Sequence, residues 1–182
     1  MSTSLVTLAL LAGVAHADDN VVATTAKKPP VTIPHEKIEL DNGLDVILAE
    51  DHSVPFVWVN LWYNVGSKDE QAGRTGFAHL FEHLMFHGSE ALPRDAREKR
   101  LLSLAVDENA WTDEDRTVYV ARAPAASLGA LLEVEADRFA DLSLTAEGVR
   151  REAGAVYGEF RKGRASPDRR VHTLLRETAF DA

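Results

Sequence analysis

Two histidines and a glutamate within five residues are the part of the sequence best suited to chemistry. His79 and His83 are four residues apart, so on a helix both imidazoles leave the same face one turn apart. This spacing lets two imidazole nitrogens reach one Zn²⁺ at about 2.0–2.1 Å each. Glu82 flanks that face, where it can accept a proton from a water that the metal has made acidic. The segment therefore predicts a zinc site with Glu82 as its catalytic base.

Apolar residues surround this motif. A helix that is apolar almost all round is typically buried, and buried histidine and glutamate side chains need partners. A metal ion is one such partner, and a hydrogen-bonded cluster in the core, without metal, is the alternative. The apolar residues are Phe77, Ala78, Leu80, Phe81, Leu84, Met85 and Phe86.

A third histidine, His87, follows His83 by four residues, and Gly88 comes directly after it. Glycine is common where a helix ends, so we expect the helix to end at Gly88. The negative end of the helix dipole favours a histidine at that position. We therefore interpret His87 as a helix-end residue and not as a metal ligand.

The third protein ligand of the metal must come from elsewhere in the chain, because catalytic zinc sites usually have three. The sequence contains no cysteine, so carboxylates are the natural source. Glu133, Glu135, Glu152 and Glu159 all lie on segments with a helical pattern. Spacing leaves all four open, although Glu152 and Glu159 lie seven residues apart, on one helix face. For each of them the alternative is an exposed glutamate paired with an arginine or lysine.

Hydrophobic periodicity and turn residues predict the elements that position these side chains. Residues 35–40 and 44–49 form a hairpin around Asp41-Asn42-Gly43, and the nearly continuous apolar run 55–65 predicts a central strand. This order of elements predicts an α+β fold, in which a mainly antiparallel sheet packs against several helices. The other predicted strands are 109–112 and 116–121, and the predicted helices are 77–88, 93–106, 124–142, 145–162 and 171–180.

Composition is that of a folded, acidic domain. The 182 residues are 45% hydrophobic, enough to bury a core. The formal net charge is −9, from 20 Lys and Arg against 29 Asp and Glu. Because nucleic-acid-binding proteins carry a basic face, we expect no nucleic-acid partner.

The first residues are typical of an exported protein. Residues 1–17 hold a short apolar run and end in Ala15-His16-Ala17, a cleavage pattern of signal peptides. The run is too short to span a bilayer, although the segment lacks the usual Lys or Arg. We therefore predict a signal peptide at 1–17, a linker at 18–34, a domain at 35–182, and a periplasmic or secreted location without a membrane span.

The chain resembles the pitrilysin and insulinase family of metallopeptidases (peptidase family M16), which includes mitochondrial processing peptidase. The pattern H-x-x-E-H at 79–83 is the inverzincin signature. Segments 65–70, 86–89 and 109–117 also look like the family's pattern, and the resemblance covers most of residues 35–180. It implies the LuxS-like metallohydrolase fold and a catalytic unit of two homologous halves closing around a chamber. This chain would supply most of the N-terminal half.

The resemblance also implies roles for particular residues. The family signature continues with a glutamate seventy-odd residues after the motif, which points to Glu159 as the third zinc ligand. Glu152 matches a second family glutamate that supports the site. Asn109 and Ala110 match an edge strand that pairs with the backbone of the substrate. Without the family, these two residues belong only to an ordinary short strand.

The predicted function is that of a zinc-dependent endopeptidase that cleaves peptides or unfolded protein segments. Zn²⁺ is the cofactor, a peptide is the substrate, and a second homologous half, fused or separate, is the partner. The alternative is a non-catalytic partner or substrate-binding subunit, which would not need the complete set of His79, Glu82, His83 and Glu159. A zinc-buffering module is a third reading, and it leaves Glu82 without a role.

Overall fold

The structure is a computed structural model that describes residues 32–179. The predicted signal peptide and most of the predicted linker lie outside these residues. The chain divides into two units, residues 1–50 and 51–182. No helix within residues 32–179 is long and apolar enough to cross a membrane.

The described part of the first unit is the predicted hairpin. Strand β1 (Glu36–Glu39) pairs antiparallel with β2 (Asp45–Leu48). The turn is closed by the Gly43 N–H, which donates to Leu40 O at 2.8 Å. Gly43 adopts a φ of 82°, a conformation that glycine reaches without strain. The Asp-Asn-Gly sequence therefore forms the tight turn that it predicts.

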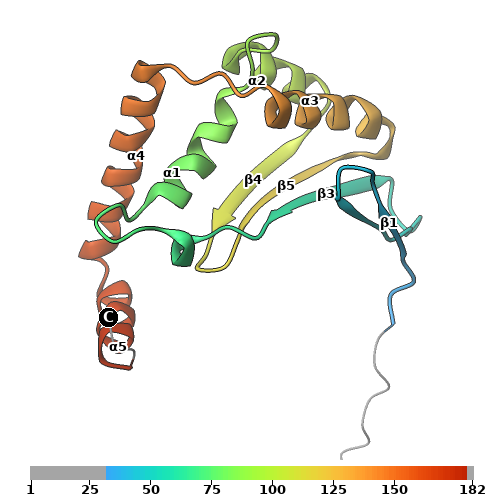
Figure 1. Cartoon of the computed structure of the whole chain (residues 1–182). Coiled ribbons are helices and arrows are strands. Elements are labelled where there is room, and N and C mark those ends of the chain that lie inside the picture. The colour runs from blue at the N-terminus through green and yellow to red at the C-terminus, as the bar shows by residue number, and fades with distance from the viewer. Residues whose placement is uncertain (1–31, 180–182) are drawn as a thin grey trace, which may run out of the picture. The chain divides into compact units, whose positions relative to one another are not determined.

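The second unit contains a three-stranded antiparallel sheet in the order β3-β5-β4 (Figure 1). Its strands are β3 (Phe56–Tyr63), β4 (Asp107–Thr112) and β5 (Thr117–Pro124). The prediction that β3 is central is wrong for the described sheet, because β5 has a partner on both sides. The apolar run in β3 has a different cause. Val57 and Val59 pack against the core cluster, while Trp58 and Trp62 on the other face stay exposed.

Helices cover one face of this sheet, and α4 runs beside α1 (Figure 1). The core between helices and sheet consists of Leu101, Leu131 and Val134 packed on Ala121 and Ala123 of β5. The α+β prediction is confirmed. The helices are α1 (Phe77–Leu84), α2 (Arg94–Ser103), α3 (Leu128–Ala140), α4 (Ala146–Ala165) and α5 (Pro167–Ala179), with 3₁₀ turns η1 (Ser67–Asp69), η2 (Met85–His87) and η3 (Ala125–Ser127).

Two helix boundaries differ from prediction for local reasons. The histidine helix changes to 3₁₀ geometry after Leu84 and then ends at Gly88, which has a φ of 79°. Helix α5 begins at Pro167 and not near Val171. Proline is favoured at the first helical position, because its missing N–H would have no partner there. Nor is α1 buried all round, since Phe77 and Phe81 are about half exposed.

Candidate metal centre

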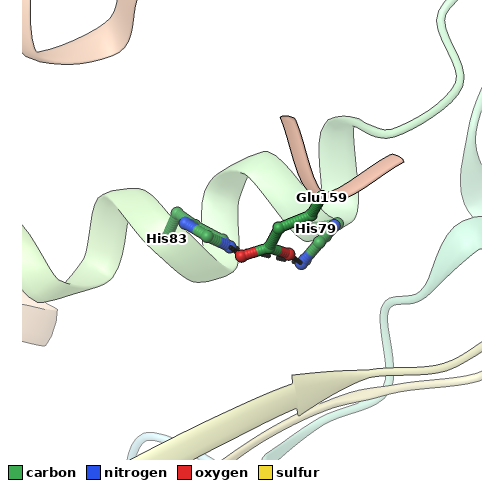
Figure 2. A group of neighbouring side chains, drawn as sticks. All are labelled: His79, His83 and Glu159. Atoms are coloured by element: carbon green, nitrogen blue, oxygen red, sulfur yellow. Dashed lines mark hydrogen bonds and ion pairs between the residues drawn. The ribbon is translucent and has the colours of Figure 1, made fainter. Parts of the chain in front are cut away.

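Three side chains from two helices converge on one point (Figure 2). His79 and His83 of α1 place their Nε2 atoms 3.2 Å apart. The Glu159 carboxylate of α4 lies across from them, with Oε2 at 3.5 Å from His79 Nε2 and Oε1 at 3.8 Å from His83 Nε2. This is the group among the described residues whose donor atoms could hold one metal ion.

The distances among these atoms fit a zinc ion. Ligand atoms at about 2.0–2.1 Å in a tetrahedral site are about 3.3 Å from one another. The three contacts, at 3.2, 3.5 and 3.8 Å, are close to that separation. Two imidazoles and a carboxylate are also a donor set that catalytic zinc uses, with a fourth position left open. The residues present therefore fit the metal that the sequence predicts.

Local capping fixes the start of each helix that carries a candidate ligand. The Glu70 carboxylate accepts hydrogen bonds from the N–H groups of Gly76 and Ala78, each at 2.8 Å. A carboxylate at a helix N-terminus satisfies free donors and interacts favourably with the helix dipole. On α4, the Thr145 side chain accepts from the Gly148 N–H at 3.0 Å. Both ligand-bearing helices thus begin at a defined residue.

Glu82 lies on α1 next to the ligand group and is only 8% exposed. Its Oε2 atom accepts a hydrogen bond from Thr112 Oγ1 at 2.5 Å. The Thr117 hydroxyl donates to Val65 O at 3.0 Å and lies 3.3 Å from Thr112 Oγ1. Since Thr117 directs its only proton to Val65, the Thr112 proton is left for Glu82. One oxygen of Glu82 is therefore held, and Oε1 has no partner among the described residues.

Glu82 and the three candidate ligands line the same cavity. Its volume is about 1120 Å³, and the end of β4, residues 109–112, forms part of its wall. A carboxylate in such a cavity can accept a proton from a water or a substrate group that enters it. The arrangement is therefore chemically suited to hydrolysing a bond of a molecule bound in the cavity.

Glu152 contacts His83 at the ring nitrogen that faces away from the other candidate ligands. Its Oε2 lies 3.5 Å from His83 Nδ1, on the side of the ring away from the other ligands. Its Oε1 accepts from His87 Nε2 at 3.0 Å and from Arg94 Nη1 at 3.1 Å. Burial alone would raise the pKa of Glu152, but these donors outweigh it and hold the pKa below its ordinary value. An ionised Glu152 favours a proton on Nδ1 of His83, which leaves Nε2 free to bind a metal.

The other two candidate third ligands lie elsewhere. Glu135 is buried against Arg97 and Arg138, and its Oε2 accepts from Arg138 Nη2 at 2.5 Å. Glu133 is exposed on α3. Burial explains the first case, because a carboxylate taken out of water needs a charged partner. The predicted alternative, an exposed glutamate paired with an arginine or lysine, is therefore met only in part, since Glu135 is paired but buried and Glu133 is exposed.

Asn109 and Ala110 lie on β4, at an edge of the described sheet. The Asp113 N–H donates to Arg116 O at the turn, so the pair formed by Ala110 and Tyr119 falls at a non-hydrogen-bonded position of the ladder. The Ala110 N–H therefore points away from β5. It donates at 2.9 Å to the Asn109 side chain, a contact that an incoming strand could replace.

Sequence reasoning did not identify Thr112, Glu70 or Arg94. The signal for Glu70 was an acidic residue shortly before the histidine helix. Thr112 and Arg94 carry no such signal, because their contacts join segments that are far apart in the chain. His87 was placed correctly at the end of the helix, but it is buried against Glu152 and does not face solvent.

Known proteins share this sequence and fold. The family model described as Insulinase (Peptidase family M16) matches residues 45–182. The chain is 31% identical over 150 residues to cytochrome b-c1 complex subunit 1, mitochondrial, of Rattus norvegicus. The aligned residues cover 82% of this chain and 31% of that protein. It is 30% identical over 152 residues to mitochondrial-processing peptidase subunit beta of Bos taurus, covering 83% of this chain and 29% of that protein.

A solved structure agrees with these matches. The first half of the periplasmic protease PqqL from Escherichia coli superimposes with a TM-score of 0.71 at 26% identity, covering 78% of this chain and 32% of that chain. The chain thus spans about a third of the length of these three relatives.

These comparisons contradict the predicted periplasmic or secreted location. The curated relatives named above are mitochondrial proteins, whereas the solved relative is periplasmic. A location cannot be transferred from relatives that disagree, so the periplasmic or secreted location is withdrawn, while the signal peptide at 1–17 stays a prediction.

Proposed function

The chain belongs to the insulinase family of peptidases, peptidase family M16, and from that premise we propose that it is a zinc-dependent endopeptidase unit. The observation that carries the proposal is the separation of 3.2–3.8 Å among the donor atoms of His79, His83 and Glu159, beside a carboxylate. His79, His83 and Glu159 hold the metal, Glu82 is the general base and Glu152 orients His83. The substrate is a peptide or an unfolded protein segment.

Each residue has a defined task in this mechanism. When bound, zinc polarises the scissile carbonyl and makes a water acidic near neutral pH. Glu82 accepts the proton of the attacking water at Oε1, while Thr112 holds Oε2. Glu82 can then pass that proton to the leaving amine. Because Glu82 is nearly buried, it is held at one position in the cavity wall and loses little freedom on reaction.

Loss of the Thr112 hydroxyl tests whether Thr112 holds Glu82 in place for proton transfer. Thr112→Val keeps the shape and the strand preference but cannot donate to Glu82, so we expect kcat to fall about tenfold to a hundredfold with little change in KM. Thr112→Ser, which keeps the hydroxyl, should retain most of the activity. Steady-state kinetics with a peptide substrate measures both. Equal activity of the valine variant and the unmodified protein would exclude a role for this hydrogen bond.

Substrate binds in the proposal as an added strand along β4. The outward N–H of Ala110 would donate to a substrate carbonyl in place of the Asn109 side chain. Backbone hydrogen bonds along an edge strand give affinity with little dependence on substrate sequence. This geometry also brings the substrate to the wall of the cavity that contains Glu82.

Removing the Ala110 N–H tests strand addition. Proline is tolerated on an edge strand where the N–H does not pair within the sheet. Ala110→Pro is therefore expected to raise KM about threefold to tenfold, because one hydrogen bond to the substrate is lost. Zinc content should stay unchanged. Ala110→Ser keeps the N–H and serves as the matched control. A proline variant with unchanged KM would mean that substrate does not use this edge.

The alternative function is a non-catalytic partner or substrate-binding subunit. It is favoured by the likeness to a protein named as a subunit of the cytochrome b-c1 complex. The two functions differ in one experiment, in which peptide hydrolysis is followed before zinc removal by a chelator, after it, and after zinc is restored. A peptidase loses and regains hydrolysis, whereas a binding subunit shows binding without hydrolysis throughout.

The proposal includes a second homologous half, because the chain matches about a third of the length of cytochrome b-c1 complex subunit 1 and of the first half of PqqL. In the proposal, this half is fused or separate and forms the opposite wall of a chamber around the cavity. Kinetic measurements are therefore made with that half present, fused or added.

A further inference from the structure

His87 makes contacts that its place at a helix end does not explain. It is only 9% exposed, and its Nε2 is used on Glu152 Oε1 at 3.0 Å. That nitrogen is therefore not directed at the group formed by His79, His83 and Glu159. An interaction with the helix dipole requires no partner on another helix, whereas this ring contacts Glu152 and Gly148 of α4.

Glu152 links His87 to His83, because each of its two carboxylate oxygens faces one of the two histidines. Oε1 is held by His87 and Arg94, and Oε2 faces His83 Nδ1 at 3.5 Å. Holding one oxygen fixes the rotation of the carboxylate and so fixes where the other oxygen lies. Glu152 is itself nearly buried, so water cannot easily take the place of these donors. Arg94 reaches Oε1 from a more exposed position, with 42% of its side chain accessible.

Close packing against Gly148 adds a second constraint. A Cβ atom at Gly148 would lie 2.8 Å from His87 Cε1, which shows that the ring sits directly on the backbone of α4. Gly148 is in the first turn of α4, one turn before Glu152 and three before Glu159. His87 therefore joins the segment that follows α1 to the helix that carries the third candidate ligand.

We propose that His87 is a positioning residue of the metal site, acting through Glu152 on His83 and through Gly148 on α4. This inference rests on the proposed function, because it needs a metal at His79, His83 and Glu159. Outer partners of a ligating histidine typically contribute about 10–100-fold to metal affinity. The role of His87 is thus to keep the site shaped for the metal before any substrate binds.

The test measures zinc affinity of the full chain by competition with a coloured chelator, so it does not depend on activity. His87→Met fills similar space without a donor and should weaken zinc binding about 10–100-fold. His87→Gln places an amide donor near the position of Nε2 and should recover most of the affinity. His172→Met, on the exposed surface of α5, is the matched control and should change nothing. Circular dichroism of each metal-free variant shows whether it folds.

A double-mutant cycle separates positioning from general stability. If His87 acts through Glu152, His87→Met should change zinc affinity less than about threefold when Glu152→Gln is already present. The inference would be overturned if the losses of zinc affinity in His87→Met and Glu152→Gln multiply in the double variant. It would also be overturned if His87→Gln binds zinc as weakly as His87→Met. Absence of zinc binding by the unmodified chain would instead overturn the proposed function. The two failures are therefore told apart by the first titration.

Discussion

Glu82→Gln is expected to lower kcat about 10²–10⁴-fold while zinc content stays near one ion per chain. Glutamine keeps the size of the side chain and can still accept from Thr112 through its amide oxygen. It cannot accept a proton from water, so the chemical step loses its base. KM should change little, because the proposed substrate contacts lie mainly along β4. Steady-state kinetics and elemental analysis of the same preparation measure both quantities.

Glu133→Gln is the control for this variant, since Glu133 is exposed on α3 and outside the cavity. It should retain full activity. Unchanged activity of Glu82→Gln in the presence of the second half would show that Glu82 is not the base. Loss of zinc from Glu82→Gln would show that Glu82 is a ligand or is needed to form the site.

Glu159→Gln is expected to abolish stoichiometric zinc binding, and Glu152→Gln is not. Glu159 lies 3.5–3.8 Å from the two imidazole nitrogens, where a ligand to a shared metal must be. A neutral amide is a poor ligand for zinc, which prefers carboxylate, imidazole and thiolate. Glu152 faces the far nitrogen of His83, so its loss weakens binding without removing a ligand. Elemental analysis after dialysis distinguishes the two variants.

Glu147→Gln, in the first turn of the same helix, is the control, because its side chain is exposed. It should bind one zinc per chain. If zinc is lost from Glu152→Gln and kept in Glu159→Gln, the third ligand is Glu152 and the assignment made here is wrong.

The local elements that carry the candidate site follow from the sequence. The spacing of His79, Glu82 and His83 requires only a helix, and the apolar pattern supplies one. The hairpin, the antiparallel strands and the order of helices also follow from patterns within short segments. Glu159 could be chosen among four carboxylates only through the family resemblance, because the distance between α1 and α4 is not encoded in either helix alone.

Contacts between distant segments account for what the sequence could not predict. Thr112 and Glu82 are thirty residues apart in the chain, and His87 and Glu152 are sixty-five apart. Nothing in the type of these residues indicates that they meet. The wrong assignment of β3 as a central strand has a similar cause. An apolar run indicates that both faces of a strand are apolar, but it does not indicate how many strands pair with it.

The X-ray absorption spectrum of the purified protein at the zinc edge tests the proposed metal site most directly. We expect one zinc with light-atom neighbours at about 2.0–2.1 Å, two of them imidazole nitrogens. His79→Ala and His83→Ala should each remove one imidazole signal or the metal itself. A protein without bound zinc, or a zinc ion whose spectrum survives both substitutions unchanged, would contradict the proposed metal site.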